Sequence, residues 1–183
     1  MNIGAAVVVA SLVGLIIWHQ REYNPNGTIK KLTDYELKHF EAWEFGQWFD
    51  RMDKQTLICL DKFREAWGDS VIVSSADGGL GRELGQHHNS MHNVDKHGKV
   101  KAVDFFPTGL NVNNARHAFA LAKKSGFTGI GLYPFTTLNG LRAWMMHGDT
   151  RADRTPTNPA KWARMENGEY TAIEQAFNPE LVS

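Results

Sequence analysis

The sequence predicts an α+β domain, with a small antiparallel sheet and helices packed on one side, preceded by an N-terminal hydrophobic helix. Two observations favour this class. Short segments rich in β-branched and aromatic residues alternate with segments of helical period, and an uncharged run occurs only near the N-terminus. The 183 residues suffice for one domain with its own core. We predict an anchor-like helix over 1–20, a linker over 21–33 and a domain over 34–183.

The uncharged run extends from Ile3 to Trp18. As a helix it would measure about 24 Å, slightly less than the ~30 Å hydrocarbon core of a bilayer. No basic residues precede the run and no small-x-small cleavage site follows it, which argues against a signal peptide. We therefore expect a membrane anchor with Trp18 at the interface. The alternative is a helix buried in an oligomer or a larger particle.

Two helices are predicted in the first half of the domain. Thr33 or Asp34 can cap a short helix that carries Leu37 and Phe40. A second helix is expected from about residue 53 to residue 67, because its apolar residues fall on one stripe. Cys59 lies on that apolar face, and we interpret it as a core residue.

The remaining elements follow from local composition. Strands are predicted at 71–75, 101–107, 129–134 and around 141–151, because these stretches are β-branched or alternating. A helix is expected from Asn113 through Lys124, with Gly126 ending it. The segment after residue 151, with Pro156 and Pro159, is expected to be irregular.

Composition excludes several classes of function. Twenty basic residues balance twenty acidic residues, so no positive excess favours nucleic acid as a partner. One cysteine permits neither an internal disulfide framework nor a zinc site built from several cysteines. A metal site in this chain would therefore use histidine and carboxylate ligands.

Three residues are the candidate ligands. His92 precedes a predicted turn and Asp104 lies in the strand after it, so that a hairpin can bring both to one metal ion. A carboxylate within an apolar strand also needs a partner. His147 lies in a later strand and is the best third candidate. Three protein ligands and a water are typical of catalytic Zn²⁺.

The order of these residues resembles the M15 family of zinc peptidases, which includes D-alanyl-D-alanine carboxypeptidases and phage L-alanyl-D-glutamate endopeptidases. The matching segments extend from about residue 37 to residue 162. They are Ser90-Met91-His92, Gly98, Ala102-Val103-Asp104, GIGLYP at 129–134 and HGDTR at 147–151, together with HFEAWEF at 39–45 and IVSSADGGLGR at 72–82.

The resemblance implies a zinc metallopeptidase with His92, Asp104 and His147 as ligands and with Arg82 and Ser90 binding substrate. The expected substrate is the peptidoglycan stem peptide, cleaved next to a D-amino acid. With the apolar run it implies a phage endolysin held at the membrane and facing the cell wall, or a hydrolase carried in the phage virion, where residues 3–18 contact other subunits. Arg82 as a surface residue and Ser90 as a turn residue are the plainer alternatives.

Two departures from the family pattern affect the site. The spacing between His92 and Asp104 is longer than is common in the family. Trp144 stands where many members have a catalytic acid, three residues before the last histidine. We therefore predict Asp149 as the general base, because on a strand it shares a face with His147. Pairing with Arg151 is the structural alternative for Asp149.

Other residues and another class of function stay open. Glu83 and Asp95 are the next candidates for the base, and His88 competes with His92 as a ligand. The rival to an enzyme is a non-catalytic zinc-binding structural module of a phage particle, which kept the metal ion and lost the base.

Overall fold

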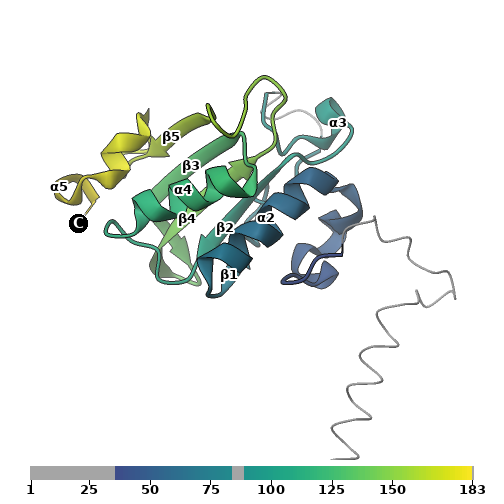
Figure 1. The fold of residues 1–183 in the computed structure, drawn as a ribbon, viewed down its shortest axis with the longest axis horizontal. Coiled ribbons are helices and arrows are strands. Elements are labelled where there is room, and N and C mark those ends of the chain that lie inside the picture. Colours follow the sequence, from purple (N-terminus) through teal and green to yellow (C-terminus); the bar gives the residue numbers. More distant parts are fainter. Residues whose placement is uncertain (1–35, 84–88, 183) are drawn as a thin grey trace, which may run out of the picture. The chain divides into compact units, whose positions relative to one another are not determined.

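The computed structural model describes residues 36–83 and 89–182. The predicted N-terminal helix, the linker and His88 lie outside these residues. No helix within the described ranges is long and apolar enough to cross a membrane. The described residues from Leu37 onward belong to one compact unit, shown in Figure 1.

A six-stranded mixed sheet forms the centre of this unit, in the order β1-β2-β4-β3-β5-β6. All neighbouring strands are antiparallel except β3 and β5, which run parallel. The predicted α+β class is therefore confirmed, but the sheet is not purely antiparallel. The strands are β1 (Val71–Val73), β2 (Ala102–Pro107), β3 (Gly129–Leu138), β4 (Leu141–Asp149), β5 (Ala160–Arg164) and β6 (Tyr170–Thr171).

Helices α2 (Lys54–Trp67) and α4 (Ala115–Ser125) lie over one face of the sheet (Figure 1). Asp53 caps α2 by accepting hydrogen bonds from the backbone N–H groups of Gln55 and Thr56. Gly126 ends α4 in the left-handed conformation, with φ of 111°, as its position in the sequence predicts. Both predicted helices are thus confirmed to within two residues.

The core lies between these helices and the inner face of the sheet. Phe105 of β2 is fully buried and meets the edge of Phe63 from α2, with ring centroids 5.1 Å apart. Phe127 covers Gly148 of β4, where a Cβ atom would come within 2.6 Å of the ring. Cys59 is buried in the same core, as predicted.

Three local predictions are wrong. Residues 36–41 are not helical; a 3-10 element, η1 (Ala42–Arg51), follows them and contains the non-helical Gly46. No simple hairpin joins His92 to Asp104, because the short helix α3 (Val94–His97) lies between them. The segment after residue 151 is not irregular throughout, since it contains β5, β6, η2 (Ile173–Phe177) and α5 (Pro179–Val182).

Candidate metal centre

Two neighbouring strands and one loop bring the three predicted ligands together. Asp104 of β2 lies directly opposite His147 of β4 in the antiparallel register. His92 enters from the loop before α3. Its backbone N–H lies within hydrogen-bonding distance of Ser90 Oγ, and its carbonyl accepts from the Arg82 N–H. The pairing of β2 with β4, rather than closeness in sequence, therefore creates the group.

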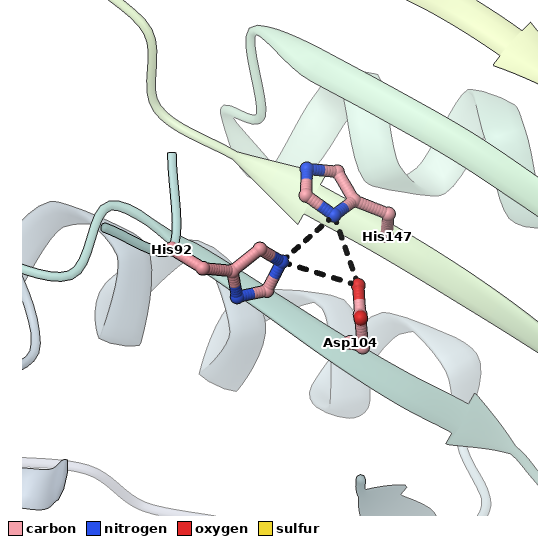
Figure 2. A group of neighbouring side chains, drawn as sticks. All are labelled: His92, Asp104 and His147. Atoms are coloured by element: carbon pink, nitrogen blue, oxygen red, sulfur yellow. Dashed lines mark hydrogen bonds and ion pairs between the residues drawn. The ribbon is translucent and has the colours of Figure 1, made fainter. Parts of the chain in front are cut away.

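The ligand atoms of this group converge on one point (Figure 2). His147 Nδ1 lies 2.9 Å from Asp104 Oδ1, His92 Nε2 lies 3.2 Å from His147 Nδ1, and His92 Nε2 lies 3.5 Å from Asp104 Oδ1. Both histidines are buried, and Asp104 is partly exposed. His92, Asp104 and His147 could therefore hold one metal ion.

The hydrogen-bond partners of the His147 ring favour a positive charge between His147 and Asp104. The Asp149 carboxylate lies 3.1 Å from His147 Nε2, so this nitrogen carries a hydrogen and donates it. In a neutral ring Nδ1 then has no hydrogen, yet it faces an oxygen of Asp104. A proton held between His147 and Asp104, or a metal ion, makes this contact favourable.

The pKa values of His147 and Asp104 are shifted in the directions that favour a proton between them. Burial lowers the pKa of His147, but hydrogen bonds to Asp104 and Asp149 outweigh it and raise the pKa to about 9. Burial raises the pKa of Asp104, but its bonds to His147 and His92 hold that pKa well below its usual range. Both shifts favour a proton between His147 and Asp104, at the point where a metal ion would bind.

Asp149 lies on the other side of the His147 ring from Asp104. Its side chain is fully buried and accepts hydrogen bonds from Nε and Nη2 of Arg151 as well as from His147. Arg151 also lies over the Trp162 ring, 5.4 Å from its centroid. The structural alternative for Asp149, pairing with Arg151, is thus present.

The group opens into a cleft of about 790 Å³. Arg82 and Ser90, the predicted substrate-binding residues, line this cleft together with the three candidate ligands. Trp144 is buried in the core and does not line it. Glu83 pairs with Arg51, and Asp95 is exposed on α3; neither lines the cleft. Asp104 is the only carboxylate among the described lining residues.

The second wall of the cleft was not predicted. It is formed by side chains from β3, β5 and β6, among them Tyr133, Trp162, Arg164 and Tyr170. The signal in the sequence was the alternation of Trp162 and Arg164, two residues apart on one face of a strand. The two prolines before this segment, Pro156 and Pro159, favour irregular structure and hide this alternation.

Two glycines of β3 make room for these side chains. A Cβ atom at Gly129 would lie 2.2 Å from an Asp149 carboxylate oxygen, and one at Gly131 would lie 2.6 Å from Trp162 Nε1. Gly129 pairs with Asp149 and Gly131 pairs with His147. The Gly-x-Gly pattern therefore lets side chains from both neighbouring strands extend over β3.

Comparisons with family models, with curated proteins and with solved structures give no match. The case for a function therefore depends on the site and on the resemblance of its motifs.

Proposed function

We propose that this chain is a zinc-dependent peptidase that cleaves the peptidoglycan stem peptide next to a D-amino acid. The observation that carries the proposal is the convergence of His92, Asp104 and His147 at one point that opens into a cleft. A half-buried carboxylate in an apolar strand is costly unless it has charged or hydrogen-bonded partners, and such groups in a cleft often mark a functional site. The M15-like motif order supplies the reaction class.

The spacing of the ligand atoms suits zinc. In a tetrahedral site with bonds of about 2.0–2.1 Å, the ligand atoms lie about 3.3 Å apart. The three distances of 2.9, 3.2 and 3.5 Å bracket that value. Two imidazoles and one carboxylate match the ligand preference of Zn²⁺, and three protein ligands leave a fourth position open to the cleft.

Other residues around the site would orient His147 and bind the peptide substrate. A zinc ion held there would supply an activated water and polarise the scissile carbonyl. Asp149 fixes the tautomer of His147, and Arg151 in turn holds Asp149. Arg82 presents a guanidinium for a carboxylate of the peptide. We accordingly assign Asp149 a positioning role ahead of the base role predicted from the sequence.

We propose further that the enzyme acts on the cell wall from a phage virion or from the membrane, as an endolysin or a particle-borne hydrolase. The uncharged run from Ile3 to Trp18 is the feature that supports attachment.

A non-catalytic zinc module of a phage particle is the second candidate. One observation favours it: apart from the ligand Asp104, no carboxylate is found among the described residues of the cleft. A peptidase usually uses such a group to accept a proton. Under this proposal the metal ion stabilises the loop that carries His92 against β2 and β4.

One experiment separates the two candidates. The full chain, loaded with one equivalent of Zn²⁺, is incubated with purified peptidoglycan, and new amino groups and released fragments are identified by mass spectrometry. We expect cleavage that a chelator abolishes, that added zinc restores and that His92→Ala lacks. A wild-type chain that retains zinc but releases no fragment would support the structural module.

A further inference from the structure

The arginines that line the cleft differ in whether they form an ion pair with a described residue. Arg82, Arg151 and Arg164 line it, against the single carboxylate of Asp104. Arg151 is neutralised by its ion pair with the buried Asp149. Arg82 and Arg164 form no ion pair with any residue that the structure describes. The Nε–H of Arg82 donates to the Gly78 carbonyl, and that of Arg164 donates to the Gly168 carbonyl.

These two arginines lie on different sides of the metal group. The backbone of Arg82 is bonded to that of His92 and Val94, beside β2. Arg164 ends β5, two strands beyond β4 in the sheet. Strands lie about 4.8 Å apart, so the Arg164 backbone is about 10 Å across the sheet from His147. An extended peptide spans that distance in about three residues.

The strand register places Arg164 on the open face. His147 pairs with Gly131, and Gly131 pairs with Trp162. Tyr133 and Arg164 each lie two residues further along their strands, so both side chains leave the sheet on the face of His147. Tyr170 of β6 pairs with Arg164 in the antiparallel ladder between β5 and β6. These side chains therefore form one wall beside the metal group.

The wall keeps one hydroxyl hydrogen available to a ligand. Trp162 Nε1 donates to Tyr133 Oη at 3.0 Å, and Tyr133 in turn hydrogen-bonds Tyr170, so the Tyr170 phenol keeps its hydrogen for another acceptor. Tyr170 is 66% exposed, and its ring stands perpendicular to that of Tyr133, with centroids 6.4 Å apart. A guanidinium beside an exposed phenol is a donor set suited to a carboxylate.

We propose that Arg164, flanked by Tyr133 and Tyr170, binds a carboxylate of the substrate on the β5 side of the metal group. This inference rests on the proposed peptidase function and narrows it. With Arg82 on the other side, the preferred substrates are stem peptides that carry a free carboxylate on each side of the cleaved bond. Peptides amidated on the β5 side are poor substrates.

The test is a thermodynamic cycle with synthetic probes. A stem peptide with free carboxylates is compared with derivatives in which one carboxylate at a time is replaced by a carboxamide. Binding to the full-length, zinc-loaded protein is measured by calorimetry, and hydrolysis is followed separately. The variants are Arg164→Gln and Arg164→Lys. The matched control is Arg142→Gln on β4, because Arg142 stacks on Phe135 and does not line the cleft.

We expect Arg164→Gln to weaken binding of the acidic peptide about tenfold or more, as is usual for a charged hydrogen bond. The loss should disappear when the peptide is amidated at the carboxylate that Arg164 binds. The substitution and the amidation then remove the same interaction. Arg164→Lys should recover part of the affinity, and Arg142→Gln should bind like the wild type.

Equal losses with every derivative, no loss at all, or failure of the wild type to bind any of the peptides would each overturn the subsite. Failure of the peptidase function gives a different pattern. Binding that depends on Arg164 and on one carboxylate, without hydrolysis, retains the subsite and rejects the enzyme. Hydrolysis that is indifferent to Arg164 retains the enzyme and rejects the subsite.

Discussion

The two faces of the sheet carry different parts of the molecule's chemistry. On the face under α2 and α4, strands β2 and β4 present Val103, Phe105 and Met146, all fully buried. On the other face the same strands present Asp104 and His147 to the cleft. Successive residues of one strand thus belong to the core and to the candidate metal site in turn. Adjacent substitutions should therefore have separable effects.

Loss of a ligand is the largest effect expected on the open face. Asp104→Ala removes the carboxylate that contacts both histidines. Zinc should fall from one ion per chain to nearly none, and hydrolysis should fall with it, a loss beyond the 10–100-fold typical of residues behind a ligand. Metal analysis after gel filtration measures this, with Asp95→Ala on α3 as the control. An Asp104→Ala protein that keeps a full equivalent of zinc would disprove the site.

The next residue should behave in the opposite way. Phe105→Ala opens a cavity between the sheet and α2, where Phe105 meets Phe63. Its free energy of unfolding should fall by about 3–5 kcal/mol. Denaturant titration gives this value, and the fraction still folded should bind zinc as the wild type does. A folded Phe105→Ala protein without zinc would show that the two faces are not separable.

Substitution of Asp149 tests whether a residue that contacts a ligand, but is not itself a ligand, affects zinc binding. Because Asp149 holds the Nε2 hydrogen of His147, Asp149→Asn should lower zinc affinity 10–100-fold, about 1.4–2.7 kcal/mol. Turnover should largely recover at saturating zinc. Competition with a chromogenic chelator measures the affinity, with Asp153→Asn as the control. If zinc affinity is unchanged and turnover falls 10²–10⁴-fold, Asp149 is the base after all.

The smallest effect is expected at Trp162. Trp162→Phe keeps an aromatic ring beside His147 but removes the hydrogen bond to Tyr133. The free energy of unfolding should fall by about 1 kcal/mol, and zinc affinity should change less than for Asp149→Asn. Thermal unfolding and the same chelator competition provide both numbers. A loss of zinc affinity as large as that of Asp149→Asn would mean that the indole also positions His147.

The sequence was informative where local patterns decide the structure. The helices capped at Asp53 and ended by Gly126, and the strand around Asp104, follow from periodicity and end signals. The three candidate ligands came from their order along the chain, and the structure brings all three together. A carboxylate in an apolar strand was the most telling of these signals.

Non-local pairing accounts for what was missed. Strand β5 has five residues and pairs parallel with β3. Its formation therefore depends on a partner that lies 31 residues earlier rather than on its own composition. The wall with Arg164 was missed with it. The contacts of Asp149 likewise needed the β3–β4 register, because Gly129 makes room for its carboxylate.

Because Asp104 pairs with His147 across two strands, metal binding at this site would require β2 and β4 to be correctly aligned. These residues are 43 positions apart, and a slip of one residue between β2 and β4 would turn one ligand toward the helices. A chain with misaligned strands therefore cannot hold the ion with all three ligands. Zinc present during refolding should select the correctly aligned molecules and draw the population toward them by mass action.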